Sequence, residues 1–401
     1  MTASRITALD VLRGVAVMGI LVANMPAFAL PEAAYFNPRA WGGTAPADLA
    51  VWFATFVLVE SKLRALFSML FGASMLLVVE RAAASGRDPA SVHLRRMAWL
   101  FAIGCMHLYA VWWGDILAHY ALCGAIAYMA AGLRVRWLLG IAAVLTLWQI
   151  VQEAGLYLAL TATDVGPRFV AAMAQTFGIP PHGDLLREVA AYRGDYTQVF
   201  AWRWRHATSP LTLLPLLAPE TLAAMLVGMA GLKSGFLRRE WPRAQYGWCA
   251  GVGLGIALPV YAWLGWRTLG GGFALRDVVL GSVSASAALR LPGAIGLAAL
   301  ILLATRDGGW LTTRIAAVGR VAFTNYLATS VVMTTIFYGY GLGLFGALSR
   351  ADLYTLVPIA WIAMLAWSQP WLARYRHGPL EWMWRSLAQW RVEPMRIVAP
   401  R

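Results

Sequence analysis

Residues 11–30 read VLRGVAVMGILVANMPAFAL, and this apolar run decides the class of fold. A helix needs about 20 mainly apolar residues to cross the hydrocarbon core of a bilayer. Further apolar runs follow near 63–80, 97–113, 115–133, 137–162, 214–232, 244–266, 277–304, 315–340 and 352–371. They lack the alternation of polar and apolar residues that marks the strands of a membrane barrel. The sequence therefore predicts an all-α, polytopic transmembrane helix bundle of ten spans, forming a single membrane domain over 1–401.

The composition excludes a soluble protein. Of the 401 residues, 60% are hydrophobic and 13% are charged, which is far from the usual balance of a globular domain. The formal net charge is +14, but the basic residues are scattered over many loops and form no compact module, so we expect no nucleic-acid partner. The three cysteines show no zinc-binding spacing, and we expect no metal.

The distribution of Lys and Arg predicts the orientation. The segments assigned to the cytoplasmic side carry 19 Lys and Arg in 78 residues, and they are 1–10, 81–96, 134–136, 233–243, 305–314 and 374–401. The opposite segments carry 10 in 104 residues, and they are 31–62, 163–213, 267–276 and 341–351. Cytoplasmic loops of membrane proteins are enriched in Lys and Arg. Both termini are therefore predicted to lie in the cytoplasm.

Three segments are predicted to lie outside the simple spans. Residues 31–62 begin with several Pro and Gly residues and continue amphipathically, which predicts an outer lid loop followed by a helix that dips into the membrane. Residues 163–213 are mixed in charge and rich in Trp, Arg and Tyr, which indicates a cap over the outer face. Residues 378–401 have large apolar side chains at helical spacing, which predicts a helix on the inner membrane surface.

The stretch GCMHLYAVWWGDILAHY (104–120) holds the first candidate site. Ionisable side chains at membrane depth are costly, and they usually mark a functional position. His107 lies about 16 Å along the helix from the inner Arg96, and Asp115 is expected to cap the next helix. A carboxylate that orients His107 would leave a general base at neutral pH. The alternative, weighed equally, is a histidine bonded to a backbone carbonyl.

Other polar residues within the spans also need partners. Asp10 and Arg13 lie one helical turn apart, so they are expected either to pair with each other or to leave Arg13 for an anion or nucleotide. Asn24 follows on the same helix and can bond a neighbouring helix or a substrate. Lys62 requires a partner or a watery cavity. Asn325 and Tyr326 give span 315–340 a polar inner end. Contacts between packed helices would account for these polar residues as well as a functional site would.

Several blocks of sequence resemble one family. They are LDVLRGVAVMGILVAN (9–24), LPEAAYFNP (30–38), LFSMLFGAS (66–74), GDIL (114–117), GRVAFTNYL (319–327) and GPLEWMWRSL (378–387). Together they resemble the YeiB-like bacterial inner-membrane proteins, a family whose domain is named for unknown function. The blocks extend over nearly the whole chain, and the resemblance implies a multi-pass protein of the bacterial inner membrane.

The opening helix is similar, at greater distance, to transmembrane acyltransferases of the heparan-α-glucosaminide N-acetyltransferase type. The matching positions are Asp10, Arg13, Asn24 and the Trp41-Gly42 pair. Such enzymes take an acyl group from cytoplasmic acyl-CoA and deliver it to an acceptor across the membrane. The catalytic histidine that those enzymes carry before the loop Trp is missing here, because Pro38 stands near its place. His107 is the substitute that geometry suggests.

The leading hypothesis is therefore a transmembrane acyltransferase with acyl-CoA as co-substrate and no tightly bound cofactor. His107 would be the base, Asp115 its orienting group and Asn24 the donor to the oxyanion. The acyl-CoA contacts are assigned to Asp10, Arg13, Arg95, Arg96, Asn325, Tyr326 and Arg385. The acceptor contacts are assigned to Asn37, Trp41, Lys62, His119 and Tyr120.

The expected partners are the lipid bilayer and a small-molecule, glycan or lipid acceptor, and a homodimer is compatible with the sequence. The alternative hypothesis is a transporter or flippase for a small or lipid-linked substrate, in which the same buried polar residues form the path. A third is a scaffold for envelope assembly, which gives His107 no role.

Overall fold

The structure is a computed structural model that describes residues 7–397, and helices are its regular elements apart from one isolated bridge between Tyr375 and Arg396. The long helices are α1 (Thr7–Ala29), α2 (Pro46–Leu58), α3 (Lys62–Ala84), α4 (Pro89–Met106), α6 (Val135–Thr161), α10 (Pro210–Lys233), α11 (Arg243–Gly270), α13 (Ala287–Ala304), α15 (Ala322–Phe337) and α17 (Leu356–Arg374). The shorter ones are η1 (Glu32–Tyr35), η2 (His107–Val111), α5 (Leu117–Ala127), η3 (Tyr128–Ala130), α7 (Pro167–Phe177), α8 (His182–Tyr192), α9 (Tyr196–His206), η4 (Phe236–Arg238), α12 (Leu275–Val278), η5 (Val279–Ser284), α14 (Trp310–Arg320), α16 (Arg350–Leu353) and α18 (Pro379–Gln389). The predicted all-α class is confirmed.

Seven helices in the described chain are long and apolar enough to cross a membrane, or eight if the bent pair α14–α15 is one span. The pair bends by 77°. α4 and α5 fall short of this measure, because α4 carries His93, Arg95 and Arg96 and α5 has only 11 residues. The count of ten spans therefore stays a prediction.

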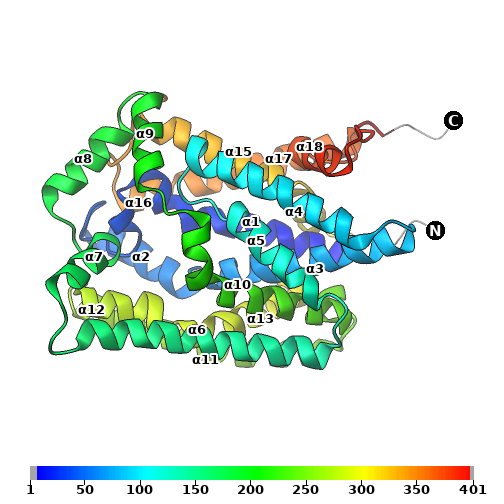
Figure 1. Ribbon diagram of the computed structural model, residues 1–401, viewed down its shortest axis with the longest axis horizontal. Coiled ribbons are helices and arrows are strands. Elements are labelled where there is room, and N and C mark those ends of the chain that lie inside the picture. The colour runs from blue at the N-terminus through cyan, green and yellow to red at the C-terminus, as the bar shows by residue number, and fades with distance from the viewer. Residues whose placement is uncertain (1–6, 398–401) are drawn as a thin grey trace.

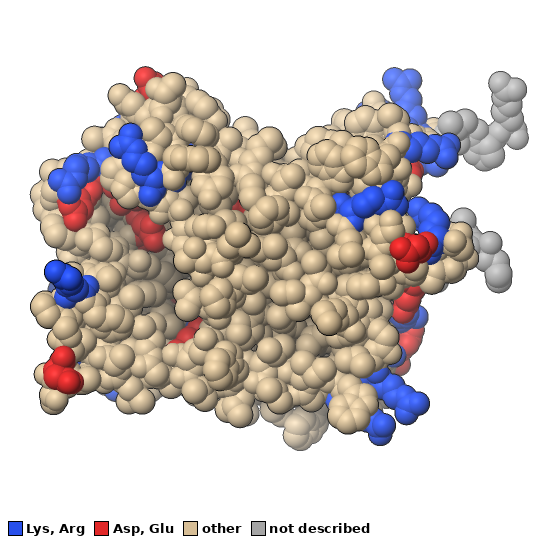
Figure 2. Space-filling view, viewed as in Figure 1, with Lys and Arg blue, Asp and Glu red and all other residues tan. Residues whose placement is uncertain are grey.

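The helices run between two polar faces (Figure 1). We call the face at which α1 begins and α18 lies the terminal face, and the face that carries α7, α8 and α9 the distal face. Figure 2 shows charged side chains gathered at these two ends of the molecule and a mainly uncharged surface between them. This arrangement is that of a bundle whose middle lies in hydrocarbon.

α1 lies inside the bundle and approaches α14 very closely. A Cβ atom at Gly319 would lie 1.8 Å from the backbone oxygen of Asp10, and one at Gly14 would lie 2.1 Å from that of Ile315. Small residues allow membrane helices to pack backbone to backbone in this way. The close approach fixes the first turns of α1, with Asp10 and Arg13, against the bend between α14 and α15.

The α8 segment of the predicted cap contacts η1 through two acidic residues. The backbone N–H of Glu32 donates to Glu188 Oε1 at 2.9 Å. Burial, together with the negative charge of Glu32, raises the pKa of Glu188 to about 8. The folded protein therefore keeps a proton on Glu188 at pH values where the unfolded chain has released it.

From this raised pKa we expect the stability of the protein to fall as the pH rises through the window from about 4.5 to about 8, because the unfolded state binds fewer protons there. Glu188→Gln should weaken this dependence. The measurement is the unfolding temperature against pH, read by tryptophan fluorescence in detergent. Identical pH profiles for the two proteins would contradict the expectation.

Candidate functional site

A cavity of about 740 Å³ opens at the terminal face between α1, α3, α4, α15 and α18. This volume is in the range of sites for small molecules and cofactors. Its inner wall is mainly apolar, with Leu70, Phe71, Met97, Leu100, Leu117 and Phe323. The cavity therefore combines an open polar mouth with an apolar interior.

The mouth of the cavity is strongly basic. The arginines among its described lining residues are Arg13, Arg81, Arg96, Arg320, Arg376 and Arg385. Burial and the positive charges of neighbouring arginines, Arg385 first, lower the pKa of His377 to about 4, so this ring adds no charge at neutral pH. Arginine is well suited to bidentate recognition of phosphate. An anionic group is therefore the ligand that this mouth fits.

Internal contacts fix two of these arginines in place. Arg13 Nη1 donates to Asp10 at 3.0 Å, and its Nη2 donates to Ser74 at 2.8 Å. The ion pair between Asp10 and Arg13 is thus present, and both side chains line the cavity. The Arg96 guanidinium stacks on Trp384 of α18 at 4.1 Å from the ring centroid. α18 therefore forms one wall of the cavity as well as lying on the terminal face. The last four residues of the predicted segment 378–401 lie outside the described part of the chain.

The inner end of the cavity is formed by two tyrosines. Tyr120 of α5 shares a hydrogen bond of 2.6 Å with Ser68 of α3. Tyr326 of α15 lines the cavity and lies with its ring centroid 5.5 Å from that of His107. Tyr326 therefore separates the cavity from His107.

His107 and Asp115 form the predicted pair. His107 Nδ1 lies 2.8 Å from Asp115 Oδ1, and the other carboxylate oxygen accepts the Ala118 N–H at 2.9 Å. An ionised carboxylate can only accept, so Nδ1 carries the proton and donates. His107 Nε2 is buried and has no hydrogen-bond partner among the described residues. An imidazole oriented by a carboxylate, with its other nitrogen unused, is the arrangement of a general base.

His107 and Asn24 do not line a common cavity among the described residues. Only 1% of His107 is exposed, because its ring packs against Trp112 and Tyr326. Asn24 lines a separate void of about 10 Å³ with Tyr326 on its wall, which is about enough for one water. Tyr326 is the residue that connects the two regions.

The backbone around His107 departs from a regular helix. α4 ends at Met106, and residues 107–111 form a π-helix, a feature that often marks functional positions. Side chains of α9, in the predicted cap, donate hydrogen bonds to the last carbonyl groups of this π-helix. Arg203 donates to the oxygens of Ala110 and Val111, and Tyr196 donates to the oxygen of Ala110. The cap therefore holds the segment that carries His107.

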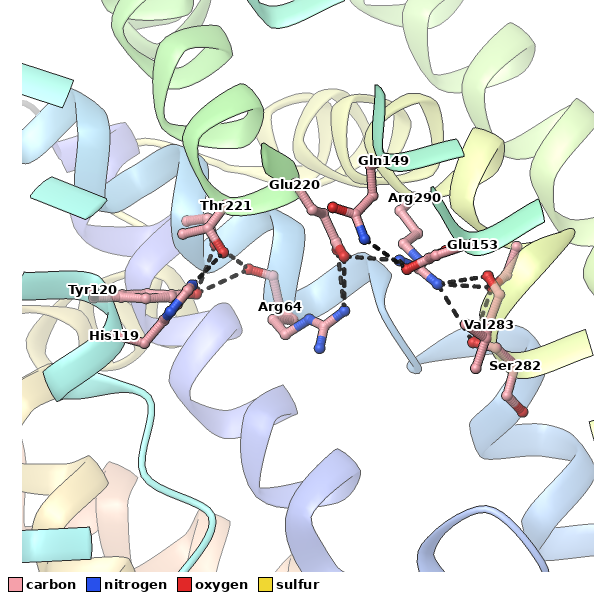
Figure 3. A network of polar contacts seen from close by, with 12 residues as sticks. Arg64, His119, Tyr120, Gln149, Glu153, Glu220, Thr221, Ser282, Val283 and Arg290 are labelled. Carbon is pink, nitrogen blue, oxygen red and sulfur yellow. Dashed lines mark hydrogen bonds and ion pairs between the residues drawn. The ribbon is translucent and has the colours of Figure 1, made fainter. Parts of the chain in front are cut away.

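A second polar cluster, which the sequence did not predict, lies among the spans (Figure 3). Arg290 of α13 donates to Glu153 of α6 at 2.8 Å and to Glu220 of α10 at 2.7 Å. Glu220 also accepts from Arg64 of α3 at 3.0 and 3.1 Å. Arg290 further donates to the Val283 carbonyl, in the second π-helix, η5. We call Arg64, Glu153, Glu220 and Arg290 the ionic chain.

Several predicted contacts lie near this chain. His119 Nε2 bonds Thr221 of α10 at 3.0 Å, and the Tyr120 hydroxyl also reaches the Arg64 carbonyl at 3.3 Å. Lys62 is buried, with its Nζ 3.3 Å from the centroid of the Tyr261 ring. It begins α3 after a break in which Ser61 has a φ of 62°.

Other predicted site residues make internal contacts away from both regions. Asn325 bonds Val318, Ser368 and Trp367. In the predicted lid, Asn37 donates to the Phe273 carbonyl and Trp41 to the Gly346 carbonyl. Arg95 bonds its own helix at Ser91 and is not a lining residue of the cavity.

Comparison with known proteins gives a consistent family. Residues 231–391 match the family model described as "Protein of unknown function (DUF418)". The uncharacterised protein YeiB of Escherichia coli is 31% identical, over 94% of this chain and 95% of its own length. The uncharacterised protein YxaH of Bacillus subtilis is also 31% identical, over 96% of this chain and 94% of its own. A further uncharacterised protein, of Bacillus acidopullulyticus, is 22% identical over 98% of this chain and 96% of its own. The chain belongs to the DUF418 family of bacterial proteins that includes YeiB.

Proposed function

We propose that the protein is a membrane-embedded acyltransferase that takes an acyl group from acyl-CoA at the terminal face, which the distribution of Lys and Arg predicts to be cytoplasmic. The observation that carries this proposal is the shape of the cavity. It has arginines at its mouth and apolar walls, and it ends at Tyr326, which packs on His107. Acyl-CoA has the same order of parts, with phosphates at one end and the acyl thioester at the other.

The reaction requires one bond to form and one to break. The acceptor hydroxyl or amine attacks the thioester carbon, His107 Nε2 removes its proton, and the carbon–sulfur bond breaks as the thiolate leaves. The proton then passes from His107 to the thiolate. Asp115 keeps the proton on Nδ1, so that Nε2 is the nitrogen that acts.

Tyr326 must move for this reaction to occur. Its ring lies between the cavity and His107, and its hydroxyl is buried without a hydrogen-bond partner in the described part of the chain. A rotation of this side chain would join the cavity to the base and to the small void beside Asn24. Asn24 would then be near enough to donate to the oxyanion, the role that the sequence predicted.

Two neighbouring arginines, Arg95 and Arg96, allow the proposed binding of acyl-CoA to be tested with a matched control. Arg96 lines the cavity and Arg95 does not, although both are on α4. Loss of a hydrogen bond to a charged group costs about 1.5–3 kcal/mol, or about tenfold to a hundredfold in affinity. Arg96→Gln should therefore weaken acetyl-CoA binding by about tenfold or more, and Arg95→Gln should not.

The measurement is titration calorimetry of the purified protein with acetyl-CoA. Equal affinities for the two variants would place the nucleotide outside this cavity. An absence of acetyl-CoA binding by the unchanged protein would remove the proposal.

The ionic chain favours a transporter or flippase as the second candidate. It links α3, which begins at a break in the chain, to a π-helix, and broken helices with buried charges form substrate sites in transporters. A labelled acetyl group supplied as acetyl-CoA to proteoliposomes separates the two candidates. Transfer leaves the label covalently bound to an acceptor, whereas transport moves an unmodified solute.

A further inference from the structure

Arg64 differs from the other members of the ionic chain in its exposure. Its side chain is 44% exposed, whereas those of Glu220 and Arg290 are 10% and 4% exposed. It lies on α3, 17 residues from Arg81 at the terminal face, a distance of about 26 Å along the helix. An accessible guanidinium at this depth needs water or a ligand, because hydrocarbon solvates no charge.

The contacts of Arg64 leave one edge of its guanidinium unused. Its Nη2 donates to both carboxylate oxygens of Glu220, and its other nitrogens make no side-chain hydrogen bond within residues 7–397. Figure 3 shows one side of this group turned toward Glu220 and the other turned away from the cluster. The Nε and Nη1 hydrogens remain available to donate to an oxyanion.

The charge of the surroundings also suits an anion. Glu220 is shared with Arg290, which is itself held by Glu153 and by the carbonyls of η5. Both carboxylates are nearly buried and accept from Arg290, although Glu153 Oε2 has no hydrogen-bond partner among the described residues. Glu60 lies within electrostatic range, but Lys62 acts on it more strongly than Arg64 does. The unused donors of Arg64 are therefore the groups that an anion would bind here.

Arg64 is also connected to the end of the cavity. Its carbonyl accepts hydrogen bonds from Ser68 and from Tyr120, and Tyr120 lines the cavity at its inner end. Arg64 and the inner end of the cavity are thus linked through Tyr120.

We infer that Arg64 is the binding site for an oxyanion group, phosphate or carboxylate, of the acceptor. This inference rests on the proposed function and deepens it, because it states the chemistry of the acceptor: the arginine mouth receives the nucleotide of acyl-CoA, and Arg64 receives an acidic acceptor from the other side.

The test titrates the full-length protein in neutral detergent and follows tryptophan fluorescence. The probes are inorganic phosphate, short-chain phosphatidylglycerol and, as an uncharged control, diacylglycerol with the same chains. Arg64→Gln should weaken binding of the phosphate-bearing probes by about tenfold or more. Arg168→Gln, an exposed arginine on α7 of the cap, should leave it unchanged. Binding of both phosphate probes indicates a soluble oxyanion, and binding of phosphatidylglycerol alone indicates a lipid headgroup.

Two further variants distinguish a loss of binding from a failure of the protein to fold. Glu220→Gln removes the carboxylate that competes for Arg64 and should tighten phosphate binding. Arg64→Lys should give an intermediate affinity because it keeps the charge and loses the guanidinium donors. Equal binding by Arg64→Gln and the unchanged protein, or no binding of either phosphate probe, overturns the inference. Acetyl-CoA binding is measured on the same samples, so a failure of the arginine cavity and a failure of Arg64 are seen separately.

Discussion

His107→Ala is expected to lower the rate of acyl transfer by about a hundredfold to ten-thousandfold, the range that general base catalysis contributes. Acetyl-CoA binding should be unchanged, because Tyr326 lies between His107 and the cavity. The measurement is release of free CoA thiol from acetyl-CoA in the presence of a total bacterial envelope extract, which supplies the acceptor.

Asp115→Asn is the companion variant. It keeps the size of the side chain but removes the charge that fixes the tautomer of His107, so kcat should fall while KM stays the same. Full activity of His107→Ala would remove this residue from the mechanism. The transport candidate would then lead.

Arg290→Met is expected to reduce stability by about 3–5 kcal/mol, because it leaves Glu153 and Glu220 as buried charges that have lost their shared partner. Arg239→Met is the matched control. The Arg239 partner, Asp307, is 81% exposed, and an exposed ion pair contributes about 1 kcal/mol or less. The measurement is chemical unfolding in detergent.

A triple variant sharpens this prediction. Arg290→Met combined with Glu153→Gln and Glu220→Gln should be less destabilised than the sum of the three single changes, because the neutral side chains no longer require the arginine. Equal stability of Arg290→Met and Arg239→Met would show that the ionic chain has no structural role.

The helical class and the pair of His107 with Asp115 could be predicted from sequence for different reasons. Apolar composition alone requires helices in a membrane. His107 and Asp115 are eight residues apart and flank a single turn, so local geometry brings them together. Contacts between distant spans could not be predicted in this way, because a uniformly apolar run does not show which of its faces meets which neighbour.

The ionic chain illustrates this limit. Glu153, Glu220 and Arg290 are isolated charges within separate apolar runs, and the argument that selected His107 applied equally to them. A search for every ionisable residue inside an apolar run would have found all three. Their pairing, and the exposure of Arg64, depend on the packing of four helices.

The position of Tyr326 at the end of the open cavity also has an electrical consequence. Water in the cavity carries the potential of the terminal face inward, so the voltage across an energised membrane falls mainly over the thinner layer beyond Tyr326. Moving one unit charge through the full voltage changes its energy by about 2.3 kcal/mol per 100 mV. His107 lies just behind this tyrosine, so a proton that reaches it from the far side crosses part of the field. The rate of the proposed transfer should therefore depend on membrane voltage.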